Sequence, residues 1–492
     1  MGLEKDKFDF LIDDNDDKYE VERELGRGGQ GIVLKLKNKN LVAKIKTDRM
    51  HNIIKDPKEY KNFKNKILNI SSLQLPNSVK ITKPSHFLKE PYCGYIMQLM
   101  DNMIPLSDIL VPNDNQDSMT FYKHTGGLIR RLTILKNLAE TLEILRSLSI
   151  VYADLSPNNI FISEEVNENE VWLIDPDNMR YLIDFKSDFT RPFGTPNYMA
   201  PEVNAGKRTN DLFSDNYSFA LIAFQLLSFY QPFIGEAVIN NNDEDFGNPR
   251  KKAACGELPW ILDKNDTSNS FEITDFPKDF EYCPENIMDL FHKVFSEEGR
   301  TTPNTRPKMR DWYRELSKAI NSLYICECGH SYSYKNNSCP FCGTPRPKIP
   351  IVISSSVYSS EIAMRYNPNL TAEMRTKMNN DISKKTEKAR VLNHLSRLKD
   401  DENIDIINYD DIFFKFLDPE EVFFSIRREA DDKYYIIKKS ENIVLKYLSN
   451  GNKLIEFELN KKYKLESLDN KYFLVYKKED SIMCTRFKFK LI

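Results

Sequence analysis

Alternating apolar and polar positions dominate the first hundred residues and predict a small sheet. Runs of this kind flank a glycine-rich stretch, and two further apolar runs follow it. Apolar residues three and four positions apart predict one helix over about 57–72. The acidic residues 1–18 are expected to form a loose lead. The predicted strands are 19–25, 32–37, 41–45 and 94–100.

The pattern changes to helical spacing after residue 100. Leucines three and four positions apart predict a buried helix over 128–149, and a second apolar helix is expected over 214–229. Between them, the short apolar run 171–175 predicts a buried strand that ends in a carboxylate. This part of the chain should form a mainly helical lobe.

The last third of the chain changes character twice. A proline-containing linker is followed by a predicted charged helix over 371–400, which is either a spacer or a partner-binding helix. From Ile404 onward the apolar positions alternate with period two, as in 434–437 and 471–476. We expect a small antiparallel β domain there, and an unidentified partner protein is its proposed ligand.

Composition narrows the possible classes. The 492 residues exceed one compact core, and 40% hydrophobic content is typical of globular chains. A net charge of −3 argues against a nucleic acid or an anionic membrane as partner of the whole chain. There is no apolar run of the roughly 20 residues that a membrane helix needs, and the first residues do not resemble a signal peptide. A cytoplasmic protein without a membrane partner is expected.

The stretch 152–160 carries the most distinctive candidate chemistry. Asp154 is followed five positions later by Asn159, with apolar residues on both sides. Such a pair suits phosphoryl transfer, in which the carboxylate orients a hydroxyl and the amide oxygen holds Mg²⁺. Asp175, at the end of the predicted strand, is placed to be a second metal ligand. The alternative is a turn, in which Asp and Asn make only local hydrogen bonds.

The amino-terminal part offers matching phosphate chemistry. Gly26, Gly28 and Gly31 would let a hairpin bring backbone N–H groups near phosphate oxygens, and Val33 would cover an adenine. Lys44 lies in a β-branched run, where burial requires a partner such as a phosphate. A glycine-rich turn without function and a solvated edge lysine are the simpler alternatives.

The predicted helix over 57–72 should supply a carboxylate that pairs with Lys44. Glu59 is the only carboxylate in the body of this helix, but it lies near the helix start. Aligning the helix on its Ile67-Leu68 pair places Lys64 or Lys66 at the expected position instead. The partner of Lys44 therefore stays open at this stage.

Four cysteines near residue 330 have the spacing of a metal site. Cys326 and Cys328 form a C-x-C pair, and ten residues later Cys339 and Cys342 form a C-x-x-C pair. Four thiolates close a tetrahedral Zn²⁺ site of structural type, with no position left for a substrate. Iron in a rubredoxin-type site is the alternative, and His330 is expected to be a bystander.

Further motifs follow in order along the second lobe. Residues 194–202 read Gly-Thr-Pro-Asn-Tyr-Met-Ala-Pro-Glu, Asp215 should brace the loop of Asp154, and Arg306 should pair with the glutamate that ends the first motif. Together these stretches resemble the eukaryotic-type (Hanks-type) serine/threonine protein kinases over roughly 19–320. The resemblance implies an α+β, bilobal kinase fold with a β-rich N-lobe and a helical C-lobe.

The resemblance also implies ATP, Mg²⁺ and a protein substrate with a serine or threonine acceptor. Asp154 would be the catalytic base, Lys44 would hold the α- and β-phosphates, and Asn159 and Asp175 would bind Mg²⁺. Thr195, in its Gly-Thr-Pro setting, resembles serine/threonine kinases more than tyrosine kinases. The expected nucleotide-binding residues are Gly26, Gly28, Gly31, Val33, Ala43, Lys44, Met97, Gln98 and Met100.

The chain departs from the family pattern around the catalytic loop. Ala153 replaces an arginine that usually binds activation-loop phosphate, and Ser156 replaces a lysine. Asp-Pro-Asp at 175–177 replaces Asp-Phe-Gly, which adds a carboxylate near the metal. Arg180 or Arg191 is our candidate for the missing positive charge. These changes favour a kinase that is constitutively poised or switched by a partner.

The segments 256–260 and 306–312 are similar to those of a bacterial branch of soluble kinases, some of which act in stress or phage defence. That role is inherited by analogy only. Two other functions are considered, a pseudokinase scaffold and a kinase of small molecules. The expected divisions are an acidic lead (1–18), an N-lobe (19–100), a C-lobe (101–320), a zinc ribbon (321–346), a linker and helix (347–402) and a β-rich interaction domain (403–492).

Overall fold

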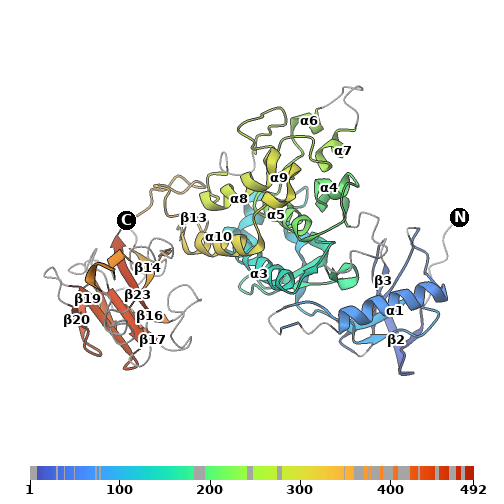
Figure 1. The fold of residues 1–492 in the computed structure, drawn as a ribbon, viewed down its shortest axis with the longest axis horizontal. Helices are drawn as coiled ribbons and strands as arrows, with labels where there is room; N and C mark the ends of the chain where they lie inside the picture. Colours follow the sequence, from blue (N-terminus) through green and yellow to red (C-terminus); the bar gives the residue numbers. More distant parts are fainter. Residues whose placement is uncertain are drawn as a thin grey trace. The chain divides into compact units, whose positions relative to one another are not determined.

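The computed structural model divides the chain into two compact units, Met1–Leu316 and Ser317–Ile492 (Figure 1). Each unit is described by itself. The structure describes residues 8–28, 31–37, 39–48, 50–72, 75–76, 79–181, 194–240, 248–273, 280–347, 350–358, 371–374, 376–377, 388–391, 403–407, 422–429, 433–448, 454–464, 473–477 and 483–491.

A twisted six-stranded sheet forms the N-lobe, with strand order β1-β2-β3-β4-β6-β5 and antiparallel neighbours. Four of its strands match the predicted ones, because alternating residues such as Leu34, Leu36 and Ile96 fill one buried face. Strands β1 and β5 were not predicted. The strands are β1 (Phe10–Ile12), β2 (Lys18–Gly28), β3 (Gly31–Leu36), β4 (Leu41–Ile45), β5 (His86–Phe87) and β6 (Gly94–Gln98).

The prediction of a loose lead is wrong for the residues that the structure describes there. Strand β1 pairs with β2, and Leu11 belongs to the core of the sheet. Asp13 is fully buried. Its carboxylate tolerates burial because it accepts hydrogen bonds from the Tyr19 hydroxyl at 3.0 Å and from the backbone N–H groups of Asn15 and Asp17. Composition missed this strand because it holds only three residues and acidic residues surround it.

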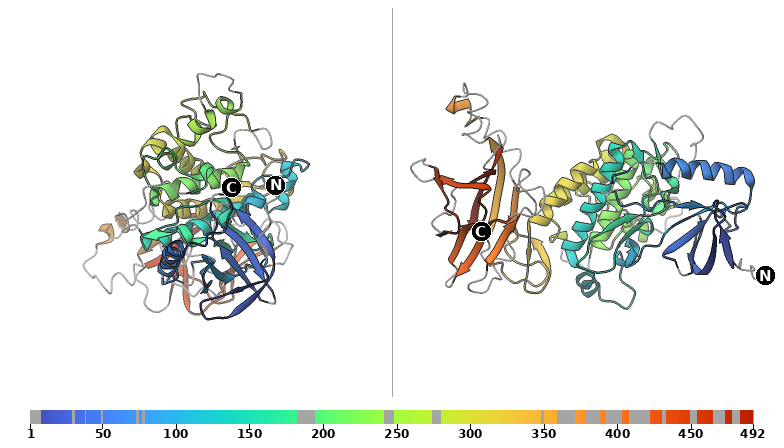
Figure 2. Two further views of the ribbon diagram at one scale, coloured as in Figure 1. Left: turned by 90° about the vertical axis from the view of Figure 1, so that its right-hand side faces the viewer. Right: turned by 90° about the horizontal axis from the view of Figure 1, so that it is seen from below.

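Helix α1 (Pro57–Ser71) confirms the helix predicted after the third long strand. Asp56 caps it by accepting two backbone N–H groups, and Pro57 fits its first turn, where no N–H donor is needed. Its buried residues are Phe63, Ile67 and Ile70, at the spacing of one helix face. Helix α1 lies against the N-lobe sheet (Figures 1 and 2).

The C-lobe is mainly helical, and its two long central helices match the predicted ones. Helix α5 is buried from Ser214 to Ser228, and its Phe224 packs edge-on against Trp260 and Phe291. The helices are α2 (Ser118–His124), α3 (Gly127–Ser147), α4 (Pro201–Asn204), α5 (Leu212–Ser228), α6 (Glu236–Ile239), α7 (Pro249–Ala254), α8 (Glu285–Phe295), α9 (Glu297–Thr301) and α10 (Met309–Asn321).

Short strands and turns at one end of the C-lobe carry the catalytic-loop sequence. Strand β9 pairs with β10 and β7, and β8 pairs with β11. These elements are β7 (Met103–Pro105), β8 (Ile150–Val151), β9 (Ile160–Ser163), β10 (Val171–Leu173), the 3₁₀ turn η3 (Pro176–Asn178) and β11 (Arg180–Tyr181). Among the residues described, no helix has the length and apolar character to cross a membrane.

The second unit holds a short hairpin and two antiparallel sheets. Its sheets have the orders β15-β14-β23-β22-β19-β20 and β16-β17-β18-β21. The strands are β12 (Leu323–Ile325), β13 (Ser331–Ser333), β14 (Pro350–Tyr358), β15 (Lys388–Val391), β16 (Asn403–Ile407), β17 (Val422–Glu429), β18 (Lys433–Lys438), β19 (Ile443–Leu448), β20 (Leu454–Glu456), β21 (Lys462–Lys464), β22 (Phe473–Lys477) and β23 (Met483–Leu491).

The prediction of a linker and helix over 347–402 is wrong in two places. Strand β14 pairs with β23 over nine residues, from Pro350 to Tyr358, and β15 pairs with β14. The β domain therefore begins before residue 403. Long-range pairing overrides the helical apolar spacing, which is a local signal. The predicted period-two strands at 434–437 and 471–476 are confirmed by β18 and, for its described residues, by β22.

A buried ion pair ties the middle of the C-lobe to its end, as predicted. Both Nη atoms of Arg306 lie 2.8 Å from the carboxylate oxygens of Glu202. Arg306 also donates to the carbonyl oxygen of Gly299 at 2.7 Å and stacks over the ring of Tyr217. A bidentate pair of this kind is stabilising only while both partners are present.

We expect Glu202→Ala to lower the free energy of unfolding of the first unit by roughly 3–5 kcal/mol, because the substitution leaves a buried guanidinium without its carboxylate. Urea titration followed by tryptophan fluorescence measures this, since Trp172, Trp260 and Trp312 all lie in that unit. Glu20→Ala is the matched control.

Glu20 pairs with Lys37 on the exposed surface, so its loss should change the unfolding midpoint very little. Equal losses in the two variants would contradict the structural role given to the buried pair.

Candidate functional site

One face of the N-lobe sheet carries the predicted phosphate-binding lysine. Residues that pair directly across antiparallel strands point to the same side, and here Val33 pairs with Lys44, and Lys44 pairs with Tyr95. Val42 pairs with Met97, two positions along the same face. Val33, Val42 and Met97 are therefore placed to line an apolar pocket beside Lys44.

Ala43 lies on the opposite face of the sheet. It pairs with Leu34 and Ile96 and belongs with them to the core of the N-lobe. The prediction that Ala43 contacts the nucleotide is therefore wrong for its side chain. Val42 is the residue that sequence reasoning missed, although strand alternation relative to Lys44 already indicates it.

Two carboxylates enclose the amine of Lys44. Asp175 accepts a hydrogen bond from Lys44 Nζ, and Asp177 Oδ2 lies 2.8 Å from the same atom. The Tyr95 hydroxyl donates to the other oxygen of Asp177, also at 2.8 Å. Lys44 is 6% exposed and Asp177 is 9% exposed, so the network is shielded from water.

The two carboxylates do not carry their charge equally. Burial raises the pKa of Asp175 to about 6, with Asp177 acting in the same direction and Lys44 opposing it. Burial acts against the charge of Asp177 as well, but Lys44 and the Tyr95 hydroxyl lower its pKa. A cation bound at Asp175 would lower the pKa of that residue and relieve the repulsion.

Helix α1 does not supply the carboxylate partner of Lys44. Its only carboxylate, Glu59, lies in the first turn and pairs with Lys46 at 3.3 Å. Lys64 pairs with Asp14. Burial lowers the pKa of Lys66, another α1 residue, while the negative charges of Asp177 and Asp175 act in the opposite direction. The partners of Lys44, which the sequence left open, are Asp175 and Asp177.

The predicted catalytic-loop residues lie close together. Asn159 Nδ2 donates to the backbone oxygen of Asp154 at 2.9 Å, which leaves the Asn159 Oδ1 as an acceptor or ligand. The Asp154 carboxylate accepts the backbone N–H of Thr195 at 2.9 Å and its hydroxyl at 3.0 Å. Asn178 Nδ2 lies 3.5 Å from the other oxygen of Asp154. The loop and the 175–178 segment are thereby connected.

Asp215 braces the backbone of this loop, as expected. Its carboxylate accepts the backbone N–H groups of Tyr152 at 2.8 Å and Ala153 at 3.1 Å. Ala153 has a φ of 71°, a left-handed conformation that a non-glycine residue adopts only when its surroundings impose it. Asn210 Nδ2 donates to the Ala153 oxygen at 2.8 Å.

Arg180 joins the same support. It donates to the backbone oxygen of Asn210, and its charge interacts with Asp215 and Asp211. Its place beside Ala153 is consistent with the proposed substitute for the missing arginine, which stays a hypothesis. Arg191 lies outside the described residues.

The glycine-rich stretch forms the predicted hairpin. Strands β2 and β3 pair as far as Gly28 and Gly31, and Gly26 pairs with Val33. A Cβ on Gly31 would lie 2.6 Å from the carbonyl oxygen of Ile45, so this glycine is required for close strand approach. Nothing lies within 4 Å of a Cβ built on Gly26, so the protein itself does not require a glycine there. Close approach of a phosphate to the backbone would explain the glycine at this position.

The predicted hinge residues follow strand β6. Met97 is buried, Gln98 at the strand end is exposed, and Met100 is partly buried. Among the three, Met97 has direct structural support as a pocket residue, through its pairing with Val42. The roles of Gln98 and Met100 stay predictions.

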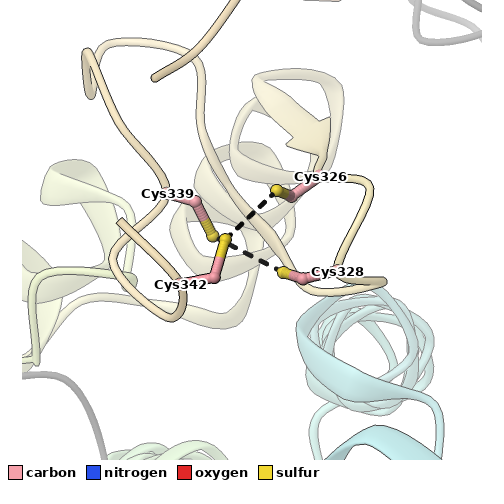
Figure 3. A group of neighbouring side chains, drawn as sticks. All are labelled: Cys326, Cys328, Cys339 and Cys342. Carbon is pink, nitrogen blue, oxygen red and sulfur yellow. Dashed lines mark hydrogen bonds between the residues drawn. The ribbon is translucent and has the colours of Figure 1, made fainter. Parts of the chain in front are cut away.

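The four predicted cysteines meet in the second unit. Their sulfur atoms all lie within 4.8 Å of one another, and Figure 3 shows them converging from two separate turns. Cys326 and Cys342 are 3.7 Å apart at Sγ, as are Cys328 and Cys339. His330 stacks on Phe341 at a centroid distance of 4.2 Å and is not part of the cluster. The set therefore fits one tetrahedral zinc ion.

The oxygen-rich site of the first unit fits a different metal. Asp175 offers carboxylate oxygens, and Asn159 offers an amide oxygen, which are donors that Mg²⁺ prefers. The donor chemistry thus agrees with the expectation for Mg²⁺.

The comparisons with known proteins agree with this fold. The family model described as "Protein kinase domain" matches residues 19–313, which is more than half of the chain. The chain belongs to the protein kinase domain family. The fold is accordingly the predicted α+β kinase fold, with a β-rich N-lobe and a helical C-lobe.

Curated relatives are similar at modest identity. Serine/threonine-protein kinase PknB of Mycolicibacterium smegmatis is 28% identical over 236 residues, which cover 45% of this chain and 34% of the relative. Serine/threonine-protein kinase pkn2 of Myxococcus xanthus is 27% identical over 45% of this chain and 25% of the relative. Calcium-dependent protein kinase 5 of Plasmodium falciparum is 27% identical over 51% and 40%. The chain spans less than half the length of these relatives.

We expect the purified chain to contain one zinc ion, and Cys339→Ser to remove it, because three thiolates hold zinc far more weakly than four. Elemental analysis of the dialysed protein measures the metal content. Cys255→Ser is the control, since Cys255 lies outside the cluster. Iron in place of zinc, or equal metal content in the two variants, would contradict the assignment.

Proposed function

We propose that the chain is an ATP-dependent serine/threonine protein kinase. One observation supports this most strongly. Lys44, the loop that holds Asp154 and Asn159, and Asp175 come from three separate stretches of sequence. Lys44 bonds to Asp175, and Asp154 bonds to Asn159 and to Asn178 of the segment that follows Asp175. Each has the chemistry that phosphoryl transfer requires.

In the proposed reaction, a serine or threonine hydroxyl oxygen attacks the γ-phosphorus of ATP. A new oxygen–phosphorus bond forms, the bond from the γ-phosphorus to the bridging oxygen breaks, and ADP leaves. The hydroxyl proton passes to Asp154, whose carboxylate is already oriented by Thr195. Most of the rate enhancement comes from positioning and charge stabilisation.

The remaining residues stabilise the phosphates. Lys44 supplies a buried positive charge for the α- and β-phosphate oxygens, and Val33, Val42 and Met97 enclose the base. Mg²⁺, when bound by Asn159 and Asp175, neutralises the charge of the transferring group. Lys44 is buried, so little water reaches its amine.

A shelf beside the loop supports a protein substrate over a small molecule. The segment Pro196–Tyr198 forms a 3₁₀ turn, and a cavity of about 110 Å³ lies against it. Pro196, Met199 and Leu221 give this cavity apolar walls. Such a surface suits a peptide side chain next to the acceptor. The β domain of the second unit is a candidate site for a partner protein.

Regulation is part of the proposal. Because Ala153 cannot bind phosphate as an arginine does, we expect activity without phosphorylation of residues 182–193, which lie outside the described residues. In the unphosphorylated chain, the catalytic loop would be held in place by Asp215, Asn210 and Arg180. A cytoplasmic signalling role is proposed, and action in stress or phage defence stays a prediction by analogy.

The expected result is transfer of labelled phosphate from Mg·ATP to serine or threonine, with Asp154→Asn reducing the rate by roughly 10³-fold or more, because the proton acceptor is lost. Mass spectrometry of the products identifies the modified residues. Asp289→Asn, on an exposed part of helix α8, is a control that keeps the wild-type rate.

Transfer to tyrosine would contradict the assigned specificity. Binding of ATP without any transfer, in the full chain and after removal of 350–492, would favour the pseudokinase scaffold. Transfer that survives in Asp154→Asn would contradict the assigned base.

A further inference from the structure

A protein kinase ordinarily orients its strand lysine with a glutamate from the helix that follows. Helix α1 has no carboxylate at that place. Glu59 is its only carboxylate, it lies in the first turn, and it pairs with the partly exposed Lys46. Lys44 nevertheless has a buried acidic environment. Another residue must therefore perform the orienting role.

Asp177 has the geometry for that role. Its Oδ2 lies 2.8 Å from Lys44 Nζ, and its Oδ1 accepts the Tyr95 hydroxyl at 2.8 Å. Lys44 and Tyr95 are direct neighbours across strands β4 and β6. Both oxygens of Asp177 are thus bonded to one rigid cross-strand pair, which fixes the carboxylate relative to the sheet.

Tyr95 is itself held in place from the helix side. Its ring stacks on Phe63 of α1, with a centroid distance of 6.1 Å and an interplanar angle of 15°. Tyr95 is fully buried, so its hydroxyl needs a partner within the protein, and Asp177 supplies it. The tyrosine therefore supports the carboxylate in a position that solvent does not reach.

Lys66 shares the inward face of α1 with Phe63, three positions earlier. The charge of Lys66 interacts favourably with Asp177 and Asp175, and unfavourably with Lys44 and Lys46. A lysine therefore faces the site from the helix where a kinase ordinarily has an acid.

We propose that Asp177 is the positioning residue for Lys44, and that Lys66 of α1 complements it, so that the acidic partner has moved from the helix to the segment after Asp175. This inference rests on the proposed function for its catalytic consequence. The orientation of Lys44 then depends on the sheet and on 175–177. It does not require a carboxylate carried by α1.

Two other roles of Asp177 make different predictions. If Asp177 were only a metal ligand, its loss would be offset by more Mg²⁺ and would not depend on residue 66. If α1 moved so that Glu59 reached Lys44, then Glu59 would be needed for activity. A set of charge-exchange variants separates these roles.

The experiment uses the full chain and five variants: Asp177→Asn, Asp177→Gly, Lys66→Glu, the double variant Asp177→Gly/Lys66→Glu, and Glu59→Gln. Binding of a fluorescent ATP analogue is measured with kcat and KM for ATP, at low and high Mg²⁺. Tryptophan fluorescence during thermal unfolding identifies variants that fail to fold.

We expect Asp177→Asn and Asp177→Gly to lower kcat/KM by roughly 100-fold, because a misplaced Lys44 no longer meets the phosphates. Lys66→Glu alone should also lower it, since a third carboxylate then competes for Lys44. The double variant should recover about tenfold over Asp177→Gly, because its helix acid restores the usual pair. Glu59→Gln should stay within about twofold of wild type, as expected for an exposed pair.

A double variant no better than Asp177→Gly would overturn the proposal, as would rescue of Asp177→Asn by high Mg²⁺ or a large loss in Glu59→Gln. Nucleotide binding keeps the test independent of catalysis. If the wild-type chain binds the analogue but transfers no phosphate, the proposed function fails. The same exchange pattern in the dissociation constants would then still support the positioning role.

Discussion

The structure of the first unit depends on one buried amine. Lys44 would be costly in the interior without compensation, and Asp175 and Asp177 supply it. Burial and the charge of Asp177 raise the pKa of Asp175 to about 6, and Lys44 opposes this shift. The cluster therefore combines a fixed cation with a site that favours a second cation. A nucleoside triphosphate with its bound metal requires such a pairing of a fixed positive charge and a metal site.

The second constraint is the support of the catalytic loop. Asp154 can act only if its backbone is held, and Asp215 holds it through the N–H groups of Tyr152 and Ala153. The left-handed conformation of Ala153 shows that this loop is kept against its local preference. Arg180 and Asn210 reinforce the same turn. Order around Asp154 is thus built into the C-lobe.

The sequence predicted the parts of the site that rest on local signals. Spacing alone predicted the four cysteines, which the structure brings together, because knuckle residues lie within a few positions of one another. Asp154, Asn159 and Asp175 were predicted from their spacing together with the order of the motifs along the chain. Sequence reasoning placed Ala43 on the wrong face by one position of strand register, where Val42 belongs. Strand β14 was missed because its partner β23 lies more than a hundred residues away. The role of Asp177 needed the fold, since Tyr95 and Lys66 approach it from distant elements.

The most direct measurement is a crystal structure of the full chain with Mg²⁺ and a non-hydrolysable ATP analogue. Our account predicts Lys44 Nζ within hydrogen-bonding distance of both Asp177 and a phosphate oxygen. It also predicts Asp175 and Asn159 on the metal, and Lys66 facing Asp177 from α1. A bound nucleotide with Lys44 paired to Glu59, or with Asp177 turned away from Lys44, would contradict it.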